Sequence, residues 1–399
     1  MFGMLLVNFL GGYKVCPQIL KHTNDYCSYA DTIMPQFFFA AGFAMRLSLG
    51  KRLQGGGKMP WGRAIRRILG LALVAIAWYS FCDLSDIITH FRTQRWDNVL
   101  FVLFKGQLFQ TLLHIAATSL WILPVITLSW KARLGYTVAS GILHLLISWW
   151  FNYDWVYGEP GGIDGGPLGF MSWAIPTLCG TLACDAVRAS GIGAGWRITL
   201  CGAALMILGW GLSIGTTLYD VPADQMAEEE AAAAATPESK PTPDPAAPIR
   251  TAKPDPRKFA ADPVIPAWER LRSWDGKIVE PPFVRPPDHK HRKWNYWMMS
   301  QRGCTISYTI FSGGLSLVVY ALFLWACDAM NWRLGIFRTL GTNSLAAYIL
   351  SDIGSWIVSP YFPRDSSSAI MALVGFACLT LIVYGCCRLL ERMGWYIRV

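Results

Sequence analysis

The chain has 399 residues, of which 53% are hydrophobic and only 15% are charged. A soluble domain carries roughly 25% charged residues, so this composition excludes an ordinary soluble protein. Repeated apolar runs of about 18 residues or more indicate a multi-pass membrane protein instead. The net charge is +9, but in a membrane protein the position of the positive residues is more informative than their sum.

The apolar runs predict an all-α polytopic fold with about ten transmembrane helices. In chain order they cover residues 1–10, 29–49, 64–81, 112–130, 136–151, 170–187, 198–219, 306–326, 334–358 and 370–390. The first run holds about half the residues that a span needs at 1.5 Å per residue. We therefore expect this helix to be truncated, with its true start upstream of Met1. No basic segment or cleavage site of a secretory signal is visible at the N-terminus.

Lysine and arginine residues gather in alternate connections between these helices. They lie at 51–67, 131–133, 188 and 333 and at the C-terminal end. Because cytoplasmic loops carry an excess of basic residues, we expect these connections and the C-terminus to be cytoplasmic. The loop containing His22, the acidic loop with Asp154, Glu159 and Asp164, and the long insertion are then extracytoplasmic.

The long insertion, residues 220–293, divides the membrane region into a first part, 1–219, and a second part, 294–399. It holds more than half of the chain's 23 prolines, together with a run of glutamates and alanines. Such a composition cannot bury enough apolar surface to fold, so we expect a Pro/Ala-rich linker that is partly disordered. From Trp268 onward, aromatic residues indicate that its distal half docks on the membrane face.

His22 lies in a short polar loop between the first two apolar runs, and Asp31 follows nine residues later. Imidazole exchanges a proton near neutral pH, and a carboxylate within reach can fix its tautomer. This arrangement favours catalysis at the membrane boundary. The alternative is an interfacial histidine that only makes loop hydrogen bonds. Cys16 and Cys27 bracket His22 and could form a disulfide in an oxidising compartment.

Two asparagines are candidate ligands of a substrate. Asn8 ends the first run, where its amide could donate to a developing oxyanion or simply cap a helix. Asn343 follows Gly341 in the ninth run, where a binding role competes with close helix packing.

Other polar side chains lie within the apolar runs. We interpret His114 and His144 as packed, hydrogen-bonded histidines, and we expect Asp185 to pair with Arg188 at i+3. A set of His114, His144 and Asp352 would instead suit a translocation path.

The order of the motifs resembles the heparan-α-glucosaminide N-acetyltransferase family of transmembrane acyltransferases. The likeness is carried by LVNFLGG at 6–12, Lys21 with His22, ADTIMPQFFF at 30–39, DGGPLGF at 164–170, IPTLCGTLA at 175–183, residues 307–328 and GTNSLAAY at 341–348. It covers most of the membrane region and none of the insertion. The Arg-rich start of the family's first span is absent, and a Gln-Arg pair of its fourth span is replaced near Leu113 and His114.

The resemblance implies that His22 is the catalytic histidine of the outer loop and that Asp31 orients it. It also implies that Asn8 contacts the carbonyl of the acyl donor, and Asn343 is a second candidate for donor binding. The implied reaction moves an acetyl group from cytoplasmic acetyl-CoA to an extracytoplasmic amino sugar or glycan, with no metal.

The expected partners are therefore acyl-CoA, a sugar or polysaccharide acceptor and the lipid bilayer of a bacterial inner membrane. A homodimer is left open, and no nucleic acid partner is expected. Two alternatives remain at this point: a transporter or flippase-like carrier, and a catalytically inactive membrane scaffold whose insertion binds a partner.

Overall fold

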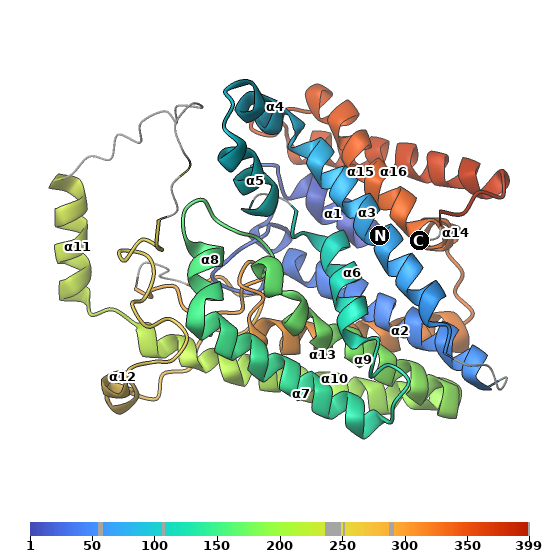
Figure 1. Cartoon of the computed structure of the whole chain (residues 1–399), viewed down its shortest axis with the longest axis horizontal. Helices are drawn as coiled ribbons and strands as arrows, with labels where there is room; N and C mark the ends of the chain where they lie inside the picture. The colour runs from blue at the N-terminus through green and yellow to red at the C-terminus, as the bar shows by residue number, and fades with distance from the viewer. Residues whose placement is uncertain (55–58, 106–107, 236–248, 250–251, 287–290, 398–399) are drawn as a thin grey trace.

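The computed structural model is built from α-helices, as Figure 1 shows, which confirms the predicted all-α class. It describes residues 1–54, 59–105, 108–235, 249, 252–286 and 291–397. Within these ranges, β pairing is limited to isolated bridges such as Asp220–Arg292.

Five segments are long and apolar enough to cross a membrane: Trp61–Cys82, Trp130–Tyr157, Gly166–Tyr219, Ile306–Ala329 and Ala369–Arg392. The third of them contains two helices, α9 and α10. These segments support the prediction of an integral, multi-pass membrane protein.

The helices of the first half are α1 (Phe2–Leu10), α2 (Ile33–Gln54), α3 (Trp61–Cys82), α4 (Leu84–Arg92), α5 (Trp96–Lys105), α6 (Thr111–Ile122), α7 (Trp130–Ile147) and α8 (Tyr153–Tyr157). The second half contains α9 (Phe170–Ser190), α10 (Ala194–Ser213), α11 (Ala223–Ala235), α12 (Trp268–Ser273), α13 (Ile306–Leu324), α14 (Gly335–Thr342), α15 (Ser344–Val358) and α16 (Ala369–Arg392). A π-helical turn, Ser148–Asn152, continues α7 into α8.

Two predicted spans differ from the observed helices. The run 112–130 forms a helix only as far as Ile122, and turns follow it. The run 334–358 is divided at Asn343, which leaves the helical conformation and separates α14 from α15. Hydropathy alone did not locate these breaks, because the first run remains apolar across its break and the second has only a short polar stretch, Thr342 to Ser344, between apolar residues.

The centre of the molecule is a close crossing of α2 and α9. A Cβ added at Gly42 would lie 1.9 Å from the Thr177 carbonyl oxygen, and one at Gly180 would lie 2.0 Å from that of Phe39. Only glycine allows the two backbones to approach this closely. The crossing holds α2, which directly follows the 3-10 turn Ala30–Thr32 containing Asp31, against the helix that follows the Asp164 loop.

An ionic cluster joins α2, α7 and α9 at the end of the helices away from His22. Arg46 donates to both carboxylate oxygens of Asp185 at 2.8 and 3.0 Å, and the buried Arg133 also donates to Asp185. Asp185 therefore joins three helices rather than forming the predicted pair with Arg188 along one helix. The i+3 spacing gave no sign of cations contributed by other helices.

The insertion lies at one side of the helices, with α11 standing off from them (Figure 1). The run of glutamates and alanines forms α11, contrary to the expectation that this run would not fold. Both residue types have a high helix propensity, so a helix forms there without a hydrophobic core. Lys293 binds Glu229 of α11 at 2.6 Å, and the Phe283 backbone donates to the Cys27 carbonyl at 3.0 Å. Residues 236–248 of the expected linker lie outside the described ranges.

Candidate active site

The loop between α1 and α2 holds His22 against Asp31. Nδ1 of His22 lies 2.9 Å from Oδ1 of Asp31, and the His22 side chain is half-exposed while the Asp31 side chain is 1% exposed. The predicted pair is therefore brought together. Because Asp31 occupies Nδ1, Nε2 is the nitrogen that is left for exchange with a substrate.

Several donors satisfy the buried Asp31 carboxylate. The Ser28 backbone and hydroxyl donate to Oδ2 at 3.0 and 2.9 Å, and the Thr23 hydroxyl donates to the same oxygen at 3.1 Å. The hydroxyl of Tyr308, on α13, donates to the Asp31 carbonyl at 2.6 Å. The Ser28 and Thr23 bonds fix the carboxylate, which in turn orients the imidazole, and the Tyr308 bond fixes the Asp31 backbone.

His22 and Asp31 line an inner cavity of about 330 Å³. Asn8 of α1 lines the same cavity and is exposed to it, so three of the four predicted site residues converge here. Met34 and Phe37 of α2 supply apolar wall, as Met4 and Val7 do from α1.

Asp164 and Gln301 also face the inner cavity. Asp164 is 3% exposed, and the Gln301 side-chain amide donates to its carboxylate at 3.1 Å. We expected Asp164 to belong to an acidic, solvated outer loop, and the structure instead buries it beside His22. Its place in the DGGPLGF motif was the available signal, whereas nothing in the sequence pointed to Gln301.

Two titratable groups of the cavity, Asp164 and His22, have raised pKa values. Burial raises the pKa of Asp164 from its ordinary 3.8 to about 7, against the opposing effects of Gln301 and His22. Burial lowers the pKa of His22, but the hydrogen bond and charge of Asp31 and the charge of Asp164 outweigh it and raise this pKa above 6.5. A group such as Asp164 that titrates near pH 7 is suited to proton transfer.

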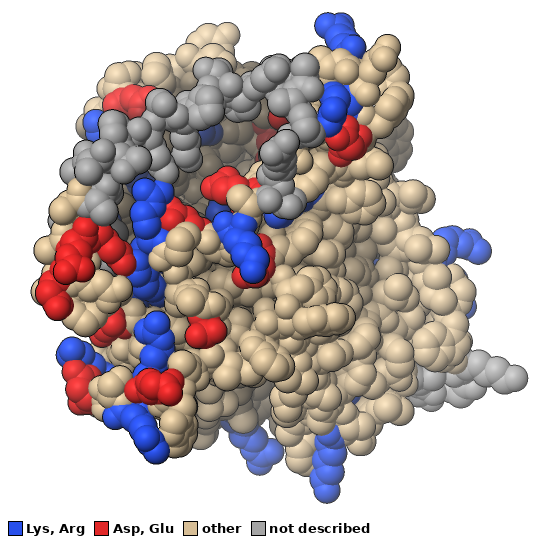
Figure 2. All heavy atoms as spheres, turned by 60° about the vertical axis from the view of Figure 1, so that its left-hand side comes forward, with Lys and Arg blue, Asp and Glu red and all other residues tan. Residues whose placement is uncertain are grey.

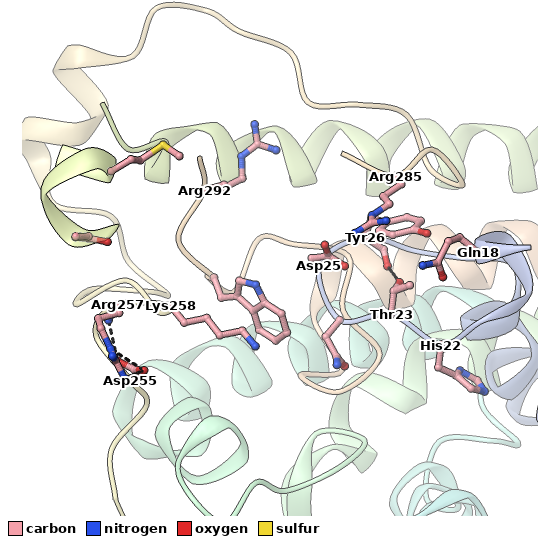
Figure 3. Close-up of a pocket in the computed structure, with 14 residues that line it drawn as sticks. Gln18, His22, Thr23, Asp25, Tyr26, Asp255, Arg257, Lys258, Arg285 and Arg292 are labelled. Atoms are coloured by element: carbon pink, nitrogen blue, oxygen red, sulfur yellow. Dashed lines mark hydrogen bonds and ion pairs between the residues drawn. The ribbon is translucent and has the colours of Figure 1, made fainter. Parts of the chain in front are cut away.

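A larger vestibule of about 680 Å³ opens on the other side of His22. Figure 3 shows His22, Thr23 and Gln18 on one side of it and Asp255, Arg257 and Lys258 of the insertion on the other. The inner cavity and the vestibule share three lining residues, Thr23, Asn24 and His22. The His22 imidazole therefore lies at the junction of the inner cavity and the vestibule. Charged side chains also gather on the outer surface over the insertion, as Figure 2 shows, while the surface over the helices is mostly uncharged.

The vestibule combines charge with an aromatic surface. Nζ of Lys258 lies 3.9 Å from the centre of the Trp294 ring, and Arg257 binds Asp255 at 2.9 Å. Asp154 and Glu159, the other members of the predicted acidic loop, are not among its lining residues.

A groove of about 550 Å³ lies between α2, α3 and α6 at the end of the helices away from His22. Arg63, Arg66 and Arg67 line it, together with apolar residues. The inner cavity reaches Phe37 on α2 and Thr111 on α6, and the groove begins at Ala41 and Ile115 on the same helices. Four residues are about one helical turn, or roughly 6 Å, so the residues that line the groove begin about one turn from those that line the cavity on both helices.

Asn343 does not join this site. Its side chain is fully buried before α15, where its Oδ1 accepts from the Ile397 backbone at 3.3 Å. This position favours the packing alternative over donor binding at the cavity. Cys16 and Cys27 are both free, so the disulfide that the sequence left open is not formed between them.

The side chains of the proposed translocation path are dispersed. His144 is buried and its Nδ1 lies 2.8 Å from the Tyr296 hydroxyl, as expected of a packed histidine. His114 is also buried, at 1% exposure. Asp352 lies at a different cavity, beside Ser355 and Arg364. In the described ranges, no cluster of three or more His, Cys, Asp or Glu side chains is placed to hold a metal.

Comparison with known proteins gives no match, either to a protein family or to a curated sequence.

Proposed function

We propose that this protein is an integral membrane acyltransferase that moves an acetyl group from cytoplasmic acetyl-CoA to an amino sugar or other glycan on the outer side. The observation that carries the proposal is the position of His22. Its imidazole is bound to a buried carboxylate at 2.9 Å and lies at the junction of an inner cavity and an outer vestibule. A group that mediates transfer between two substrates requires access from both.

The basic groove between α2, α3 and α6 is the proposed site for the nucleotide end of CoA. Its arginines match the phosphates of that end, and its apolar wall matches the pantetheine arm. From the groove, the arm would follow α2 and α6 to the inner cavity. The thioester carbonyl would then lie near Asn8, whose amide donates to the oxygen as negative charge develops.

The acceptor enters through the vestibule. Nε2 of His22 removes the proton of the acceptor amine or hydroxyl while that nitrogen or oxygen attacks the thioester carbon. The carbon–sulfur bond breaks, CoA leaves as the thiolate, and the proton held by His22 passes to the sulfur. Asp31 stabilises the imidazolium during this exchange, and Asp164 contributes further negative charge.

The proposed topology has about ten spans, including α2, α6 and α15 beside the five long apolar segments. Arg63, Arg66, Arg188 and Arg333 would lie on the cytoplasmic side, and His22 and the insertion on the outer side. The resemblance to the transmembrane acyltransferases agrees with this arrangement, in which donor and acceptor approach from opposite faces.

Binding of the donor is the direct test. The thermal stability of the detergent-purified protein is measured with acetyl-CoA, with free pantetheine and with ADP. Acetyl-CoA at 100 times its Kd stabilises a protein by roughly 2.7 kcal/mol. We expect a clear rise in Tm with acetyl-CoA and a smaller one with either fragment. An unchanged Tm up to millimolar acetyl-CoA would contradict the proposal and favour a carrier or a scaffold.

A further inference from the structure

A second polar cavity, of about 310 Å³, lies between α1, α15 and α16. Asp352, Ser355 and Arg364 face it, beside apolar residues of α1 and α16. The Lys14 backbone donates to the Arg364 carbonyl at 3.2 Å, and the Tyr13 hydroxyl donates to the Phe362 carbonyl at 3.1 Å. Because Tyr13 and Lys14 belong to the loop that contains His22, this cavity lies at the same end of the helices as that loop.

The surroundings of this cavity are those of a membrane interface. Trp78, Phe81 and Trp356 form an aromatic cluster, with ring centres 5.9 Å apart for the two tryptophans. Phe81 and Trp356 are 54% and 51% exposed, and Tyr361 nearby is 77% exposed. Large aromatic side chains concentrate where the hydrocarbon core meets the headgroups. The exposed aromatic side chains beside this cavity are of the kind found at headgroup depth.

Asp352 and Arg364 carry opposite charges into one cavity without pairing with each other. Oδ2 of Asp352 accepts from the Trp78 indole at 3.2 Å, and no ion pair to either side chain is found in the described part of the chain. An unpaired carboxylate at the edge of the hydrocarbon is costly, and a ligand that carries a cation would remove the cost. Arg364, at the rim over Gly12, is placed to bind an anion on the same ligand.

We propose that this cavity binds the zwitterionic headgroup of a phospholipid from the outer leaflet, with its ammonium on Asp352 and its phosphate on Arg364. Ser351, Ser355 and Ser359 line the cavity from α15 and its end, and they offer hydroxyls to the phosphate oxygens. The acyl chains remain outside, against the exposed Trp356 and Ile357. The lipid would contact Asn8, which also lines the inner cavity, so the site adjoins the candidate active site.

The test is native mass spectrometry of the purified full-length protein titrated with phosphatidylethanolamine or phosphatidylglycerol. The two lipids share a phosphate, and only the first has an ammonium. We expect phosphatidylethanolamine to bind about tenfold more tightly, and Asp352→Asn to remove this preference. We expect Arg364→Gln to weaken both lipids about tenfold, the loss typical of one charged contact.

Asp328→Asn and Arg333→Gln are matched controls, because these side chains are exposed at the opposite end of the helices. Both should retain the wild-type affinities. Equal binding of the two lipids to the wild-type protein, or unchanged binding after Arg364→Gln, would overturn the proposal. Arg364 is exposed, so its variant remains informative if Asp352→Asn fails to fold. None of these outcomes depends on acetyl-CoA binding.

Discussion

His22 is half-exposed although it binds a carboxylate that is almost fully buried. Burial of Asp31 and its bonds to Ser28 and Thr23 give the imidazole a fixed orientation, and His22 lines the inner cavity. Asp164 adds a second carboxylate that is deprotonated only near neutral pH. In the proposed mechanism, these three side chains act together in proton transfer at the inner cavity.

The first prediction concerns the pH dependence of transfer. In the proposed mechanism His22 acts as a base only when neutral, and Asp31 and Asp164 raise its pKa above the ordinary 6.5. The rate should therefore rise with pH through this pKa and then level off. Asp31→Asn removes the hydrogen-bonded charge that raises the pKa of His22. The acidic limb of the pH–rate profile should therefore move to lower pH, and the maximal rate should fall. An acidic limb that stays in place would show that Asp31 does not act on His22.

The second prediction concerns stability and Asp164. The unfolded chain loses this proton near pH 3.8 and the folded chain near pH 7, so the free energy of unfolding falls as pH rises between these values. Asp164→Asn cannot ionise, and its Tm should decrease less than that of the wild type between pH 5 and pH 8. Asp154→Asn removes an exposed carboxylate instead and should keep the wild-type dependence. Parallel curves for wild type and Asp164→Asn would refute this assignment.

At the scale of elements, α2 connects the site to the opposite end of the molecule. It begins beside Asp31, crosses α9 at Gly42 and ends near the cluster of Arg46, Arg133 and Asp185. The same helix lines both the inner cavity and the basic groove. A displacement of α2 would thus alter the site and the proposed donor path together.

The third prediction tests the ionic cluster. Asp185→Asn leaves the buried Arg133 without its counter-charge, and loss of one partner of a fully buried pair costs 3–5 kcal/mol. Since Asp185 is about one-third exposed, we expect a smaller loss of about 2 kcal/mol, measured as a lower Tm in detergent. Arg392→Gln, in the last turn of α16, is the control and should leave Tm nearly unchanged.

Local sequence signals predicted the long helices and the pairing of His22 with Asp31. Both depend on short-range information, namely the length of apolar runs and the nine-residue spacing within one loop. The partners of Asp185 and the burial of Asp164 were not predictable, because Arg46, Arg133 and Gln301 come from elements distant in sequence. The helix break at Asn343 was missed because hydropathy does not register a single non-helical residue.

At the scale of the whole molecule, the three hollows form an ordered series. The basic groove, the inner cavity and the vestibule follow one another from one end of the helices to the other, with His22 between the last two. The insertion supplies one wall of the vestibule, although its composition indicated a linker. The specificity of the proposed enzyme for its acceptor would therefore depend on the insertion, and its specificity for the acyl donor would depend on the helices.

The fourth prediction follows from this series. Replacing both Arg63 and Arg66 with Gln removes two cations of the groove and should raise the Kd of acetyl-CoA about tenfold or more. Lys258→Gln, in the vestibule, should leave donor affinity unchanged. Isothermal titration calorimetry measures both. Equal donor affinity in the groove variant and the wild type would exclude the groove as the donor site.

The most direct measurement is turnover of acetyl-CoA by the purified protein with a panel of amino sugars, followed by mass spectrometric quantification of acetyl-CoA, CoA and acetylated product. His22→Ala should lower the rate by about 10²–10⁴-fold, as expected for loss of a positioned base, and should retain acetyl-CoA binding. His90→Ala, a histidine of α4 outside these cavities, should transfer acetyl groups at the wild-type rate. Near-normal transfer by His22→Ala would contradict the assignment of this site.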